Sequence, residues 1–67
     1  MNKFCELVAP ALATYSDLTG LGDPTLDQSV VADLIADLRH WCDYRDWSFE
    51  QLDSQGYKHY IAELAEQ

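Results

Sequence analysis

Positively charged residues are scarce in this chain of 67 residues, which has four Lys and Arg against twelve Asp and Glu and a net charge of −8. A protein that binds DNA directly needs a basic face that neutralises phosphates. The basic residues are instead scattered along the chain, at Lys3, Arg39, Arg45 and Lys58. We therefore expect no direct binding of nucleic acid.

Long apolar runs and abundant cysteines are also missing. No segment approaches the roughly 18 apolar residues that a membrane span requires. Glu6 interrupts the short apolar stretch within residues 1–13, which we interpret as part of a helix and not as a secretory signal. The two cysteines, Cys5 and Cys42, are too few for a disulfide scaffold. We expect two reduced, half-buried thiols in a cytoplasmic protein, with a disulfide between them as the less favoured alternative.

Motifs for metal binding and catalysis are absent as well. Structural zinc sites are usually built from paired cysteines or histidines at short spacing, and no such pair occurs. His40 and Cys42 would lie roughly 160° apart on a helix. Asp53 and Ser54 resemble the attachment site of acyl carrier proteins, but Gln55 follows where those proteins have Leu. We expect no enzyme activity, no cofactor and no metal, with a carrier or metal protein as distant alternatives.

Apolar residues recur at a spacing of three and four, which predicts helices. The first predicted helix covers residues 3–19, with Asn2 as its N-cap and Gly20 in the left-handed position after its end. Leu21 is expected to fold back over its last turn. Pro10 lies inside this helix, opposite the apolar stripe, and predicts either a kink or a break.

The second predicted helix runs from about Pro24 to Tyr44 or Arg45. Asp23 is a candidate N-cap with Pro24 in the first helical position, and residues 25–28 form a competing capping box.

The third predicted helix covers residues 49–65. Residues 48–51 form a capping box, and Trp47 with Leu52 forms a hydrophobic staple. Gly56 on the apolar face predicts the close approach of a neighbouring helix or a Trp ring. Asp53 on the same face either pairs with an Arg or marks a break, after which the helix restarts at Ser54.

These segments predict an all-α fold, a small antiparallel three-helix bundle, as a single acidic helical domain of residues 1–67. Hydrophobic residues make up 48% of the chain, which is too apolar for a disordered protein. The acidic residues are interleaved with this apolar pattern, so they belong to a folded polyanion.

Carboxylates one helical turn apart lie about 6 Å apart along the helix axis, a spacing comparable to that of successive phosphates on one strand. Such a polyanion could occupy the cationic groove of a nucleic-acid-binding protein. The alternative is that the acidic surface serves solubility alone. The predicted partner-binding acidic surface consists of Asp33, Asp37, Asp43, Asp46 and Glu50.

Residues 33–43, with the pattern D-L-x-x-D-L-x-H-x-C-D, are followed by Phe49 and then by His59 and Tyr60. This C-terminal half resembles small uncharacterised proteins of phages, plasmids and integrative elements. The resemblance implies a mobile-element origin and a two-helix core, and carries no catalytic residue. Small acidic proteins of this kind are similar to anti-CRISPR inhibitors, several of which mimic DNA.

The resulting hypothesis is a non-catalytic inhibitor in the cytoplasm of a bacterial host. Its expected partner is a host protein such as a CRISPR effector subunit, whose basic DNA-binding groove the acidic surface would block. The alternative is a structural or regulatory interaction module, such as an antitoxin-like partner.

Overall fold

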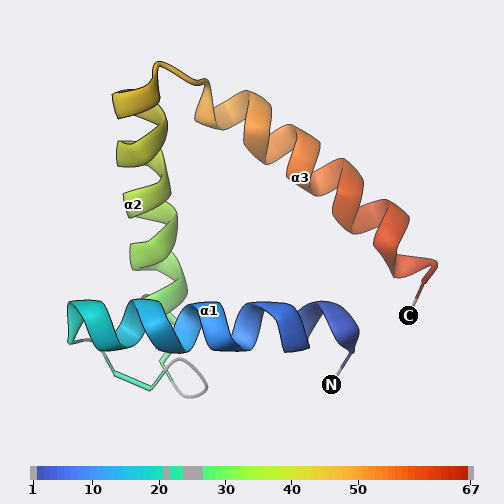
Figure 1. Cartoon of the computed structure of the whole chain (residues 1–67). Coiled ribbons are helices and arrows are strands. Elements are labelled where there is room, and N and C mark those ends of the chain that lie inside the picture. The colour runs from blue at the N-terminus through green and yellow to red at the C-terminus, as the bar shows by residue number, and fades with distance from the viewer. Residues whose placement is uncertain (1, 21, 24–26, 67) are drawn as a thin grey trace. The chain divides into compact units, whose positions relative to one another are not determined.

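The computed structural model describes residues 2–20, 22–23 and 27–66. Three helices follow one another along the chain: α1 (Lys3–Thr19), α2 (Ser29–Arg45) and α3 (Phe49–Leu64) (Figure 1). No strand occurs within the described ranges. The predicted all-α class with three helices is confirmed, whereas the antiparallel bundle packing stays a prediction. Among the described residues, no helix combines the length and the apolar character that crossing a membrane demands.

Two units divide the chain at the middle of α2. The N-terminal unit is Met1–Asp37, with α1 and the first half of α2, and the C-terminal unit is Leu38–Gln67, with the second half of α2 and α3. Each unit is described by itself below. The single domain of residues 1–67 stays a prediction.

Local signals set both ends of α1, as predicted. The Asn2 side chain accepts a hydrogen bond from the Cys5 N–H at 2.9 Å, which satisfies one of the donors left over in the first turn. Gly20 has a φ of 72°, and its N–H donates to the Ser16 carbonyl at 2.9 Å. The helix is continuous through Pro10, so no break occurs there, and the kink stays a prediction. Leu21 lies outside the described residues.

The start of α2 corrects the sequence prediction, because the helix begins at Ser29 and not near Pro24. One oxygen of the Asp27 carboxylate accepts from the Ser29 N–H at 2.9 Å and from the Ser29 hydroxyl at 2.6 Å. These hydrogen bonds, that of the hydroxyl first, lower the pKa of Asp27. Asp27 thereby supplies a cap just before the helix, a local alternative to continuing it towards the N-terminus. Pro24 and residues 25–26 of the competing capping box lie outside the described residues, so the predicted caps that depend on them stay predictions.

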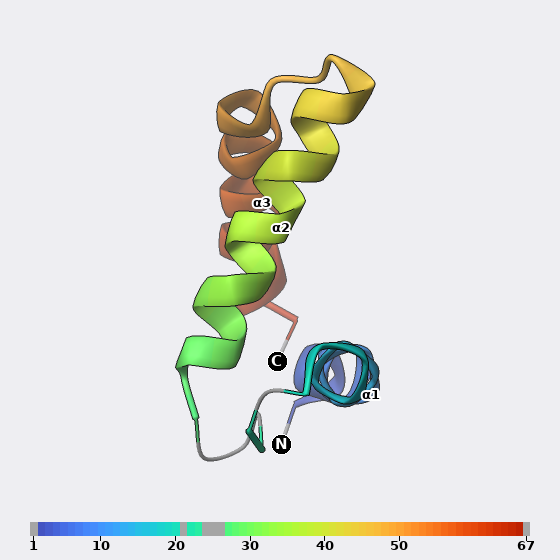
Figure 2. The same cartoon turned by 90° about the vertical axis from the view of Figure 1, so that its left-hand side faces the viewer.

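Figure 2 shows the short turn between α2 and α3. A cap at the end of α2 is followed directly by the N-cap of α3. Asp46 adopts a left-handed conformation with a φ of 58°. Its N–H donates to the Asp43 carbonyl at 3.2 Å, and the Trp47 N–H donates to the Cys42 carbonyl at 2.9 Å. This pair of hydrogen bonds is the Schellman motif, with Asp in the place that Gly usually takes.

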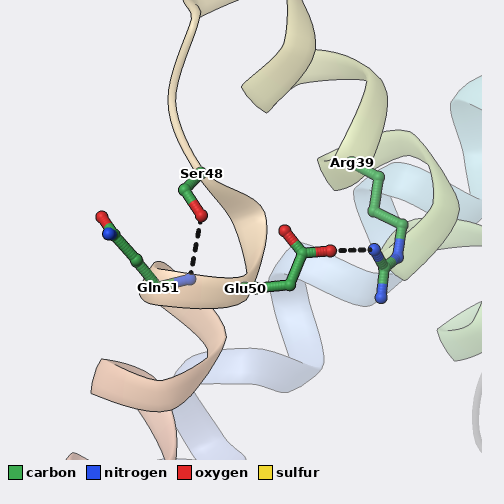
Figure 3. Close-up of polar contacts among 4 residues, drawn as sticks. All are labelled: Arg39, Ser48, Glu50 and Gln51. Atoms are coloured by element: carbon green, nitrogen blue, oxygen red, sulfur yellow. Dashed lines mark hydrogen bonds and ion pairs between the residues drawn. The ribbon is translucent and has the colours of Figure 1, made fainter.

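Ser48 then begins α3, as the capping box predicts. Its hydroxyl accepts a hydrogen bond from the Gln51 N–H at 3.2 Å (Figure 3). The helix runs through Asp53 and Ser54 without interruption, so the predicted break at this point is wrong. A Cβ added at Gly56 would meet no atom within 4 Å, so the predicted close approach to this glycine is not found among the described residues. The staple of Trp47 and Leu52 stays a prediction.

Few side chains are fully buried. Val30 and Cys42 are the buried hydrophobic residues of the described ranges, and Ser16 is the buried polar one. The Ser16 hydroxyl donates to the Gly22 carbonyl at 2.5 Å, which ties the loop to α1. Cys42 is buried and Cys5 is exposed, so neither thiol is half-buried as predicted; both are free. The apolar stripes therefore predicted where the helices are, but most of their members stay exposed.

Candidate functional site

Asp33 and Asp37, the centre of the predicted acidic surface, both lie on α2 within the N-terminal unit, and both are exposed. They are one helical turn apart and share a face of the helix. Because like charges at this spacing repel each other, the pair costs folding free energy and does not contribute to it. Helix stability therefore does not account for this pair.

Asp37 has a partner that the sequence analysis missed. The Tyr15 hydroxyl on α1 donates a hydrogen bond of 2.6 Å to one oxygen of this carboxylate. The hydrogen bond, followed by partial burial and by the charges of Asp37 and Asp33, raises the pKa of Tyr15 to about 12. The contact holds Asp37 in place while its other oxygen is left for a further donor.

Asp43, Asp46 and Glu50, the other predicted residues, surround the turn in the C-terminal unit and are all exposed. Asp43 lies in the last turn of α2, and its carbonyl accepts the Asp46 N–H. Glu50 lies in the first turn of α3, where the helix dipole favours a negative charge. The turn thus places three carboxylates within eight residues of chain, counted from 43 to 50.

Glu50 is part of a small polar cluster with Arg39 of α2. The Arg39 guanidinium donates to the Glu50 carboxylate at 3.1 Å (Figure 3) and lies over the Phe49 ring at 4.2 Å from its centre. The N–H of Glu50 itself, followed by Arg39, lowers the pKa of Glu50. Because both side chains of the ion pair are exposed, the pair adds little to stability. It shows instead how this surface holds a guanidinium, between a ring and a carboxylate.

Two further basic side chains also lie on aromatic rings of their own chain. The Lys3 ammonium lies 5.2 Å from the centre of the Phe4 ring, and the Arg45 guanidinium lies 5.2 Å from that of Trp47. Cation–π contacts of this kind are individually weak at exposed sites. Each pairs two residues close in sequence, so both are local contacts that leave most of the negative charge uncompensated.

All twelve acidic residues belong to the described part of the chain, and all but Glu63, which is half-buried, are exposed. The structure brings Asp33 together with Asp37, and places Asp43, Asp46 and Glu50 around one turn. A single surface that contains all five residues spans both units and stays a prediction.

Metal ligands do not gather in the described ranges: no group of three or more His, Cys, Asp and Glu residues there could hold an ion. A shallow, open hollow at the start of α2 is lined by Gln28, Ser29, Val31, Ala32 and Ile35. This lining carries no titratable side chain.

Comparison with protein-family models, with curated proteins and with solved structures gives no match to this chain. The resemblance of the C-terminal half to mobile-element proteins therefore stays a prediction. Function is inferred below from the charges and contacts of the chain itself.

Proposed function

We propose that this chain is a non-catalytic inhibitor that binds a nucleic-acid-binding protein of a host defence complex and blocks its DNA-binding surface. The observation that carries the proposal is the exposure of nearly all twelve carboxylates on a helical scaffold with a net charge of −8. A folded polyanion of this kind is complementary to a basic groove, and electrostatic attraction speeds its association.

The binding residues in this proposal are the exposed acids Asp33, Asp37, Asp43, Asp46 and Glu50. Asp33 and Asp37 supply two negative charges about 6 Å apart along α2, as successive phosphates would. The partner is a CRISPR effector subunit or a similar protein with a basic groove, met in the cytoplasm of a bacterial host. This choice of partner depends on the resemblance to mobile-element proteins.

The test is capture of the partner from a bacterial host by the immobilised chain, with identification by mass spectrometry. The affinity of the purified pair is then measured at low and high salt, with and without duplex DNA. We expect affinity to fall by about tenfold or more as salt rises, because exposed charges are screened within about 8 Å at physiological ionic strength. Excess duplex should displace the chain. If neither salt nor duplex DNA weakens the complex, the chain does not compete with DNA for a basic groove.

The second candidate is a structural or regulatory interaction module, such as an antitoxin-like partner. Exposed aromatic rings at the end of α2 favour it: Trp41 and Tyr44 have ring centres 5.4 Å apart, and Trp47 follows in the turn. Aromatic residues of this type often dominate the binding energy of an interface. Binding through these rings would change little with salt, so the same titration separates the two functions.

A further inference from the structure

One face of α3 exposes apolar side chains along its whole length. Tyr57 and Tyr60 are 63% and 55% exposed, and their ring centres lie 6.3 Å apart. Their spacing of three and four places them in one stripe with the other exposed apolar residues of the helix, Leu52, Ile61 and Leu64. A continuous exposed patch of this kind marks an interaction site more often than scattered apolar residues do.

Asp53 lies inside this stripe. It is one turn before Tyr57 and one turn after Phe49, so the helical period puts its side chain among the rings. Within residues 2–20, 22–23 and 27–66, the Asp53 carboxylate has no hydrogen bond or ion pair. If an apolar surface covered the stripe, this charge would be costly unless the covering surface supplied a cation. The stripe therefore selects a partner that is apolar and positively charged at one point.

Gly56 leaves room for such a partner beside Asp53. Apart from the neighbouring residues and the backbone of its own helix turn, no atom of the described residues lies within 4 Å of a Cβ built there. Glycine costs about 1 kcal/mol of helix propensity relative to Ala, so it is an expensive residue at this position. A partner backbone can approach the helix closely at a residue that has no side chain.

Arg39 indicates which cation the stripe accepts. Its guanidinium lies over the Phe49 ring and donates to the Glu50 carboxylate, a ring and an acid together. Asp53 and Tyr57 repeat the same two chemical groups, one turn apart on one face of α3. An arginine suits both groups, because its planar guanidinium stacks on rings and pairs with carboxylates.

We propose that α3 docks an amphipathic helix of a partner protein, whose apolar face covers the stripe and whose arginine pairs with Asp53. The net charge of −8 selects a cationic partner over a second copy of this chain, which would carry the same charge. This docking surface consists of other residues than the acidic surface proposed above. The docking proposal therefore holds even if the chain does not block a DNA-binding groove.

The experiment uses the full chain and two synthetic amphipathic helical peptides as probes. Both peptides have a leucine stripe; one has a central arginine and the other has the neutral isostere citrulline. Binding is measured by fluorescence anisotropy of the labelled peptides for the wild type, for Asp53→Asn and for Glu66→Gln. Glu66→Gln is the matched control, because it removes the same charge from an exposed residue that follows α3.

We expect the wild type to bind the arginine peptide about tenfold more tightly than the citrulline peptide. Asp53→Asn should lose this preference and Glu66→Gln should keep it, since only Asp53 meets the arginine. Tyr60→Ser should weaken the binding of both peptides, while circular dichroism shows unchanged helicity.

Three outcomes would overturn the proposal. If Asp53→Asn and Glu66→Gln lose the preference for the arginine peptide equally, the peptide is attracted by the net charge alone. Failure of the wild type to bind the arginine peptide would mean that the stripe is covered or inert. A dimer in sedimentation that Tyr60→Ser dissociates would assign the stripe to a second copy of the chain.

Discussion

At the scale of the residue, contacts between distant positions decide what the acids of this chain can do. The Tyr15 hydroxyl restrains Asp37. The Arg39 guanidinium pairs with the Glu50 carboxylate and lies over the Phe49 ring. The sequence supplied the residue types of the candidate site, because exposed acids in a helical pattern can be read directly. It could not supply these contacts, because Tyr15 and Asp37 are 22 residues apart and no local period relates them.

The first prediction concerns the titration of Tyr15. A pKa raised from 10.0 to about 12 means that the neutral hydroxyl stabilises the folded chain. This contribution is fully present below pH 10 and is lost as the pH rises through about 12. NMR of labelled tyrosine rings should show Tyr15 titrating at about pH 12, and Asp37→Ala should return its pKa towards 10.

Asp43→Ala, which removes an acid of the C-terminal unit, is the control and should leave the Tyr15 titration unchanged. If Tyr15 titrates alike in the wild type and in Asp37→Ala, the hydrogen bond does not persist in solution.

At the scale of the element, helix boundaries were predictable wherever one residue sets them. Asn2, Gly20 and Ser48 cap their helices as their residue types predict. The start of α2 was predicted wrongly because Asp27 caps the helix just before Ser29, whereas the sequence favoured caps at Asp23 or in residues 25–28. The exposure of the apolar stripes was not predicted for another reason. An apolar stripe shows which face of a helix is apolar, but not which surface covers that face.

The second prediction concerns Asp46 in the turn. A residue with a φ of 58° is strained unless it is Gly, although Asp tolerates the left-handed region better than most residues. Asp46→Gly should therefore be more stable to urea than Asp46→Ala by about 1 kcal/mol. The two variants lose the same charge, so the comparison isolates the backbone. An alanine variant as stable as the glycine variant would contradict the Schellman turn.

The third prediction concerns the cap of α3. Ser48→Ala should cost about 1 kcal/mol of unfolding free energy, because the Gln51 N–H loses its acceptor. Ser54→Ala, within the same helix and exposed, is the matched control and should gain up to about 0.5 kcal/mol from helix propensity. Equal effects of the two substitutions in urea unfolding would show that Ser48 does not act as a cap.

At the scale of the whole molecule, charge is the dominant property. The basic residues Lys3, Arg39 and Arg45 lie on rings of their own chain, while the acids stay exposed. Net charge this far from zero opposes folding by self-repulsion, and the proposed binding of a basic partner would account for it.

The fourth prediction tests where that binding occurs. The double variant Asp33→Lys, Asp37→Lys should weaken partner binding by about tenfold or more at low salt. The matched double variant Glu6→Lys, Asp17→Lys makes the same charge change on α1 and should have a smaller effect. Circular dichroism checks that both variants keep their helices. Equal affinities of the two variants would remove Asp33 and Asp37 from the site.

The division of the chain within α2 also separates its chromophores. Both tryptophans, Trp41 and Trp47, belong to the C-terminal unit, and Tyr15 is the one tyrosine of the N-terminal unit. Tryptophan emission therefore reports on the C-terminal unit, while the NMR signal of the Tyr15 ring reports on the N-terminal unit. A single cooperative domain requires the two signals to change at the same denaturant concentration, and a stepwise molecule would separate them.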